Sequence, residues 1–69
     1  MILANNNGMY AHIQRHTNNK SSIYLDGTTL SVHCYGLTAQ QANRLKIIIR
    51  DYIDKNMLMD SYATIKIFY

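Results

Sequence analysis

The chain is small and mildly basic, with 69 residues, a formal net charge of +3 and 48% hydrophobic residues. This apolar fraction is ordinary for a globular protein and argues against disorder, although a domain of this size buries only about 60% of its unfolded surface. No apolar run is long enough to span a bilayer, and residues 1–4 are too short for a signal peptide. A single cysteine excludes a disulfide framework and favours the cytoplasm. We therefore expect one cytoplasmic domain over residues 1–69 with no membrane partner.

The N-terminal third alternates like a strand. Met9, Ala11 and Ile13 are apolar, and the residues between them are polar or aromatic, so residues 9–16 are predicted to form a strand. Asn7-Gly8 favours a tight turn that would pair this strand with residues 2–4. Residues 17–20 have the composition of a turn.

The strongest local signal is the pair Asp26-Gly27, which lies between two strand-like runs, residues 22–25 and 28–32. A two-residue Asp-Gly loop favours a type I′ hairpin turn, in which Leu25 pairs with Thr28. One face of the hairpin is then apolar and consists of Ile23, Leu25, Leu30, Val32 and Cys34. The other face is polar and aromatic and consists of Ser22, Tyr24, Thr29, Ser31, His33 and Tyr35. Cys34 is expected in the core as a small hydrophobe.

A single amphipathic helix follows the hairpin. Thr38 can cap its N-terminus and Gln41 stands at the capping-box position. Its apolar stripe consists of Ala42, Leu45, Ile48, Ile49, Tyr52 and Ile53. The helix is predicted to end near Asn56, which tolerates the left-handed cap conformation.

Residues 61–69 alternate again and predict a terminal strand, with Ala63, Ile65 and Ile67 facing inward and Tyr62, Thr64, Lys66 and Phe68 facing outward. The predicted fold is α+β: an antiparallel β-meander of three or four strands, one amphipathic helix packed on one face, and a C-terminal strand that joins the same sheet. The central core is expected to contain Ile23, Leu30, Val32, Leu45, Ile49, Tyr52 and Ile65.

A sheet with one helix has no second layer for its opposite face. That face is predicted to collect the partner-binding residues Tyr10, His12, Tyr24, His33, Tyr35, Lys66 and Phe68. Three interpretations remain open: a solvated face of good strand-forming residues, an interface with a protein, or a platform on which nucleic-acid bases stack. We favour the protein interface, because tyrosine supplies rigid amphipathic contact area.

The outer side of the helix offers an alternative partner-binding site. Ile47 lies among charged residues, including Arg50 and Asp54. It is either an ordinary exposed apolar residue or an anchor ringed by charges that set specificity.

Catalysis and metal binding receive less support. His12 and His33 with Lys66 could supply an acid, a base and a cation for metal-independent RNA cleavage. Nothing in the sequence brings them together, and His12 and His16 are spaced as metal ligands only on a helix. We expect no enzyme activity, no cofactor and no metal.

The sequence thus predicts a small non-catalytic binding protein. Its many Asn, Ile, Tyr and Lys residues suit an AT-rich genome such as that of a phage or mobile element. On this basis we expect an inhibitor that occupies a surface of a host protein or bacterial defence complex. The alternatives are a nucleic-acid-binding module and, after it, a small RNase. Small size and an uncovered sheet face also favour a homodimer.

Overall fold

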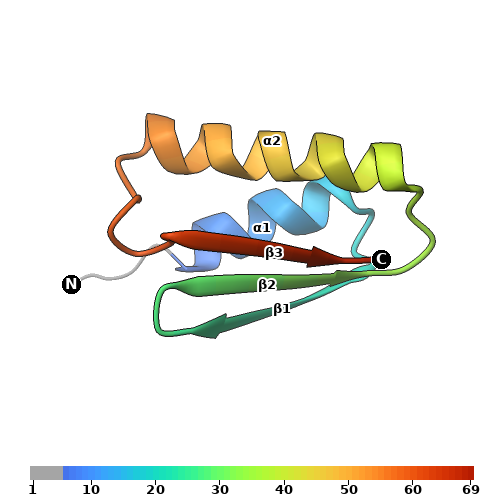
Figure 1. Ribbon diagram of the computed structural model, residues 1–69, viewed down its shortest axis with the longest axis horizontal. Coiled ribbons are helices and arrows are strands. Elements are labelled where there is room, and N and C mark those ends of the chain that lie inside the picture. The colour runs from blue at the N-terminus through green and yellow to red at the C-terminus, as the bar shows by residue number, and fades with distance from the viewer. Residues whose placement is uncertain (1–5) are drawn as a thin grey trace.

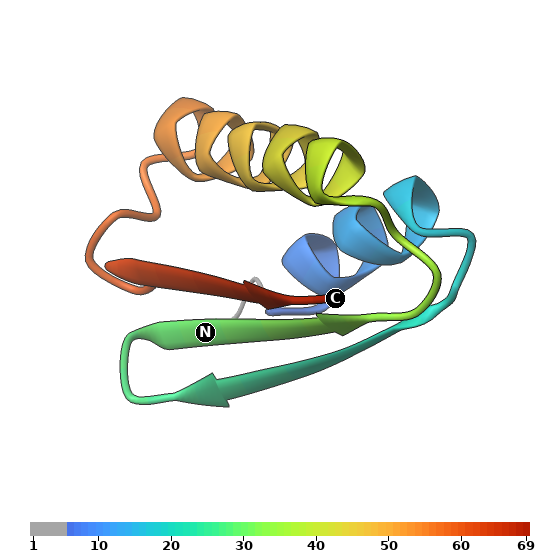
Figure 2. The same ribbon diagram turned by 45° about the vertical axis from the view of Figure 1, so that its right-hand side comes forward.

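The computed structural model describes residues 6–69, which form two layers (Figure 1). Along the chain the elements are α1 (Asn6–His16), β1 (Ser21–Asp26), β2 (Thr29–Cys34), α2 (Ala39–Lys55) and β3 (Thr64–Phe68). The sheet order is β1-β2-β3, with β1 and β2 antiparallel and β2 and β3 parallel. Both helices lie on the same side of the sheet (Figures 1 and 2). The α+β class and the C-terminal strand are confirmed, whereas the meander and the single helix are wrong.

The main correction concerns residues 9–16, which belong to α1 and not to a strand. Met9 and Ile13 are fully buried and Ala11 is exposed. Met9 and Ile13 are four residues apart, and this spacing places two side chains on one face both in a strand and in a helix. The two patterns therefore differ only at Ala11, which a strand would bury with them and a helix exposes. The pairing proposed with residues 2–4 lies outside the described residues. Tertiary packing therefore decided the conformation of an ambiguous segment.

Gly8 allows α1 to approach α2 closely. A Cβ atom at this position would lie 3.0 Å from the hydroxyl oxygen of Tyr52 on α2. A glycine within a helix lowers its intrinsic stability by about 1 kcal/mol relative to alanine. The helix is thus held by contacts with the rest of the domain more than by its own propensity.

A buried polar network joins the end of α1 to the start of β1. The hydroxyl oxygens of Thr17 and Ser21 are 2.9 Å apart. Ser21 Oγ donates to Gln14 Oε1 at 3.1 Å, and Gln14 Nε2 donates to the Ser21 carbonyl oxygen at 3.0 Å. These bonds satisfy the two polar residues buried here, Thr17 and Ser21. Without hydrogen-bond partners, moving their polar groups out of water would cost free energy. The turn predicted for residues 17–20 is confirmed between them.

The hairpin register differs from the predicted one. Leu25 is opposite Leu30, where the prediction placed Thr28, and the loop consists of Gly27 and Thr28. Gly27 has a φ of 61° and the φ of Thr28 is not positive, which matches a type II′ turn with glycine first. Because the partner of Leu25 moves by two positions, every side chain keeps its predicted face. Cys34 is accordingly buried on the helix side, as predicted.

The start of α2 is the predicted capping box. The Gln41 N–H donates to Thr38 Oγ1 at 3.1 Å, and the Thr38 N–H donates to Gln41 Oε1 at 2.9 Å. Each bond satisfies a backbone donor that the first turn of a helix leaves free. The sequence thus determined the start of this helix locally.

The end of α2 uses a different residue from the predicted one. Asn56 has a φ of −104°, and Met57 adopts the left-handed conformation with a φ of 56°. The Leu58 N–H donates to the Ile53 carbonyl at 2.9 Å and the Met57 N–H to the Asp54 carbonyl at 3.3 Å. This pair of bonds is the Schellman pattern, which usually places glycine where Met57 stands.

The core lies between the two helices and the inner face of the sheet. Its members are Met9, Ile13, Leu30, Val32, Cys34, Leu45, Ile49, Ile53, Tyr62 and Ile65. Of the seven predicted core residues, Ile23 and Tyr52 are only half-buried.

Tyr62 is buried, although it was predicted to face outward. The reason is that β3 begins only at Thr64. The Tyr62 N–H instead donates to the Leu58 carbonyl in a turn, so the strand alternation does not extend to it. Burial, with further contributions from Tyr10 and Tyr52, raises the pKa of its hydroxyl.

The assignment of α1 can be tested with a matched pair of variants. Ile13→Ala should lower the free energy of unfolding by about 2–5 kcal/mol, because it leaves a cavity in the core. Ala11→Glu should change it by about 0.5 kcal/mol or less, since this position faces solvent. Urea denaturation followed by circular dichroism measures both. In a strand the two residues would share the core face, so a comparably severe loss in Ala11→Glu would contradict the helix.

The left-handed residue at the end of α2 generates a second prediction. Met57→Gly should raise the free energy of unfolding by about 1 kcal/mol, because glycine avoids the steric cost of positive φ. Met59→Gly is the matched control, since Met59 is also exposed but has no positive φ. Denaturation midpoints compare the two. Equal shifts in both variants would count against strain at Met57.

Candidate functional site

The sheet face turned away from both helices is the candidate site. Two rows of residues cross its three strands in register, Ser22–His33–Phe68 and Tyr24–Ser31–Lys66. The intervening residues of β2 point into the core, so both rows point to the other side. We call this surface the open sheet face and define it by Ser22, Tyr24, Thr29, Ser31, His33, Tyr35, Lys66 and Phe68.

Three aromatic rings form a continuous row across the open sheet face. The centroids of Tyr24 and His33 are 5.3 Å apart with their planes at 83°, which is an edge contact. The rings of His33 and Phe68 are stacked at 4.5 Å with their planes at 14°. Tyr24 is 59% exposed and Phe68 is 47% exposed. One residue from each strand contributes, so pairing of the strands sets the spacing of the rings.

Polar groups border this aromatic row. Tyr35 is 64% exposed, and its hydroxyl lies 3.5 Å from Ser22 Oγ. Lys66 is exposed beside Phe68, and Asp26 ends β1 near the hairpin loop. Within residues 6–69 the one ion pair joins Lys55 and Asp51 on α2, so Lys66 has no acidic partner there. The open sheet face is thus amphipathic, with one unpaired cation.

Two predicted members of the face lie elsewhere. Tyr10 and His12 belong to α1, on the opposite side of the sheet. The His12 ring stacks on Tyr52 of α2 at 4.4 Å and meets His16 edge-on at 4.8 Å. They were assigned wrongly because residues 9–16 had been interpreted as a strand. The residues Tyr24, His33, Tyr35, Lys66 and Phe68 do share one surface, and their binding of a partner stays a prediction.

This separation also bears on the acid–base hypothesis. His12 packs between the helices, whereas His33 packs against Phe68 on the open sheet face. The sheet lies between the two imidazoles, so the structure does not assemble His12, His33 and Lys66 into one site.

The alternative site on α2 has the expected exposure. Ile47 is 63% exposed, and Arg50 and Asp54 are exposed on the same side of the helix at helical spacing. This surface is separated from the open sheet face by the whole thickness of the domain (Figure 1). A single small interface therefore cannot use both, and binding through Ile47 stays a prediction.

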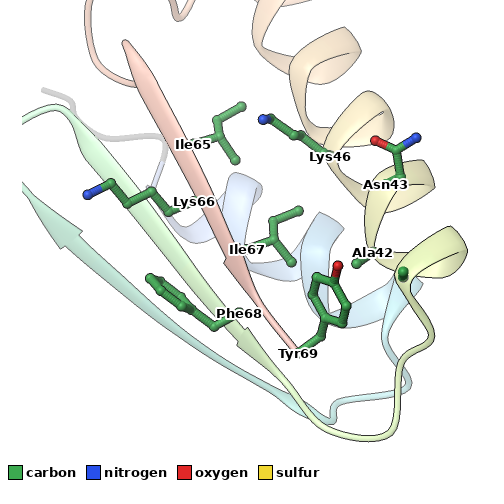
Figure 3. Close-up of a pocket in the computed structure, with 9 residues that line it drawn as sticks. Ala42, Asn43, Lys46, Ile65, Lys66, Ile67, Phe68 and Tyr69 are labelled. Atoms are coloured by element: carbon green, nitrogen blue, oxygen red, sulfur yellow. The ribbon is translucent and has the colours of Figure 1, made fainter.

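Sequence reasoning missed a groove between α2 and β3. Its volume is about 430 Å³, and it is lined by Ala39, Ala42, Asn43, Lys46 and residues 65–69 (Figure 3). None of the four α2 residues had been predicted to take part in a site. The missed signal is the pair Ala39 and Ala42, two small residues one helical turn apart that leave room beside the strand.

The described residues contain neither a cluster of metal ligands nor a membrane-spanning helix. From residue 6 to residue 69, no three His, Cys, Asp or Glu side chains gather closely enough to hold a metal ion. No helix in that range combines the length and the apolar character needed to cross a membrane. Burial raises the pKa of the Cys34 thiol, which disfavours the reactive thiolate.

Comparisons with protein-family models, curated proteins and solved structures found no match to this chain. Its function therefore has to be argued from the geometry of its own residues.

The contact between α1 and α2 predicts a pH dependence. Burial, followed by the charges of His16 and Arg15, lowers the pKa of His12 from its ordinary value of 6.5, and Asp51 opposes this. Between the lowered pKa and 6.5 the unfolded chain binds more protons than the folded one. The free energy of unfolding should therefore fall as pH decreases through that window.

The measurement is urea denaturation at several pH values between about 5 and 8, for the wild type and for His12→Gln. The wild type should lose more stability toward acid than the variant, because glutamine does not titrate. A variant with the same pH slope would show that His12 does not couple to folding.

Proposed function

We propose that this protein is a non-catalytic binding module that docks on a folded protein partner through its open sheet face. The supporting observation is the row of Tyr24, His33 and Phe68, which crosses all three strands on a face that neither helix covers. Aromatic side chains anchor protein interfaces because each buries a large area at a low entropic cost. Contacts between the rings hold them in place before a partner arrives, which reduces that cost further.

The ring geometry favours a protein over a nucleic acid. His33 and Phe68 stack face to face at 4.5 Å, close to the spacing of neighbouring strands, so their planes stand upright and their edges point to solvent. Phe68 and Tyr24 flank His33 from the two adjacent strands, Phe68 stacked on its ring and Tyr24 in an edge contact with it. A base stacks on an open ring face, and backbone tracking needs several cations. Here Lys66 is the one basic residue of the face.

The inhibitor role expected from size and composition is one form of this function. A protein that occupies a surface needs shape, aromatic anchors and a few polar groups, and it needs no assembled acid–base pair. We extend the proposal to a foreign protein as the partner. A second copy of the chain on the same face stays a prediction, which sedimentation at high micromolar concentration can test.

The test compares three immobilised proteins in capture from bacterial lysate with and without nuclease treatment: the wild type, Tyr24→Ala with Phe68→Ala, and Ile47→Asp. The double variant should lose the captured protein, whereas Ile47→Asp should retain it. Each substitution is at an exposed position and should change the free energy of unfolding by about 0.5 kcal/mol or less, which denaturation checks.

Two results would overturn the proposal. Loss of the partner in Ile47→Asp alone would move the interface to the outer side of α2. Binding that survives the double variant but vanishes with salt or nuclease would indicate phosphate contacts, because these weaken steeply as ionic strength rises.

A further inference from the structure

β3 is an edge strand with a free side. It pairs with β2 on one side and has no strand partner on the other among residues 6–69. Alternate backbone N–H and C=O groups along that side are therefore available for pairing with another strand. An edge of this kind is the element that peptides use when they bind by strand addition.

The groove between α2 and β3 runs along this free side. Figure 3 shows Ile65 and Ile67 pointing from β3 into the groove and Lys46 pointing toward them from α2, whereas Lys66 and Phe68 project from the other side of the strand. Ala42 forms part of the α2 wall, and its small side chain leaves space. We call this feature, lined by Ala39, Ala42, Asn43, Lys46 and residues 65–69, the edge groove.

We propose that the edge groove binds an acidic peptide segment in extended conformation, which adds to β3 as a fourth strand. Backbone pairing with β3 supplies the affinity, and alternate side chains of the peptide enter the groove against Ile65 and Ile67. This inference goes beyond the open sheet face, because it uses the free edge of β3 and the wall of α2, although both surfaces include Phe68.

The charges beside the edge groove favour an acidic peptide. In an added strand, one set of side chains faces the groove near Lys46, and the other set lies on the opposite face beside Lys66. Neither lysine forms an ion pair within residues 6–69, and no acidic residue lines the groove. Acidic side chains on either face of the added strand therefore meet a cation that has no competing partner.

The same charges argue against a second copy of the chain. Antiparallel pairing of two β3 strands about their centre places Lys66 opposite Lys66, which is destabilising. Each copy would also bring its own Lys46, with no Asp or Glu side chain in either groove to offset it. A lysine in the middle of an edge strand is a common protection against self-pairing.

The probe is a synthetic seven-residue peptide, Glu-Glu-Val-Val-Glu-Glu-Val, with blocked ends, so that each face of the added strand carries both Glu and Val, and its control replaces every Glu with Lys. Titration into isotopically labelled full-length protein should shift the amide signals of Thr64–Phe68 and of residues 39–46. The acidic peptide should bind at least about tenfold more tightly than the lysine peptide at low salt. Equal binding of the two peptides, or shifts elsewhere, would overturn the proposal.

Backbone N-methylation tests strand addition directly. In a strand, the amides of alternate residues point to opposite edges. Methylation of one alternate set should therefore abolish binding, and methylation of the other set should change it by less than about threefold. The set that matters also shows which edge of the peptide faces β3. Equal effects of the two patterns would show that the peptide does not pair with β3.

The variants Lys46→Glu and Lys20→Glu distinguish a contact within the edge groove from an effect of the protein's net charge on peptide binding. Both positions are exposed and both variants change the charge equally, but Lys20 lies outside the edge groove. Lys46→Glu should weaken the acidic peptide about fivefold or more, and Lys20→Glu by less than about twofold. Equal losses of peptide affinity in the two variants would show that only the overall charge of the protein matters.

Two further measurements distinguish peptide binding in the edge groove from binding at the open sheet face and from self-association. Tyr24→Ala should leave peptide binding unchanged, so loss of the sheet-face function would not affect the result. A dimer in sedimentation, with β3 amides protected from hydrogen exchange in the absence of peptide, would assign the edge groove to a second copy and overturn the proposal.

Discussion

The packing of α2 against the inner face of the sheet is the interaction on which the rest of the structure depends. Leu45, Ile49 and Ile53 bury their side chains against β2 and β3, and α1 closes the remaining side with Met9 and Ile13. The connection from β2 through α2 to β3 makes these strands parallel neighbours, which a short hairpin cannot do. Because both helices use one face, no element of residues 6–69 covers the other face, and because the sheet of these residues ends at β3, that strand keeps a free edge (Figure 2). Both candidate surfaces thus follow from one packing arrangement.

β3 connects these two surfaces. Its alternate residues serve different sides: Lys66 and Phe68 contribute to the open sheet face, while Ile65 and Ile67 contribute to the core and the edge groove. A partner that contacts the aromatic row and also supplies an extended segment could therefore engage both surfaces through one strand. Such a partner would gain affinity from the second contact without a further loss of translational freedom.

The aromatic row shows how a small sheet can organise a surface without a covering layer. Tyr24, His33 and Phe68 are neighbours only because β1, β2 and β3 place them in adjacent register positions. Their mutual contacts fix ring orientation, and the stacking of His33 on Phe68 bears on the class of partner, since it leaves their facing surfaces closed to a nucleic-acid base. The histidine contributes here as an aromatic ring between two others. Its position is a reason to look for binding before catalysis.

The sequence by itself determined the features that depend on near neighbours along the chain. The capping box of Thr38 and Gln41, the apolar stripe of α2 and the two faces of the hairpin are each encoded within a few residues, and each is present in the structure. Tertiary structure decided the rest. Met9 and Ile13 fit a strand and a helix equally well, so only contact with α2 and β1 made residues 9–16 helical and removed Tyr10 and His12 from the sheet face. The edge groove joins residues 39–46 to residues 65–69, segments that no local pattern relates, and it exists because α2 crosses beside β3 at a position where its side chains are small.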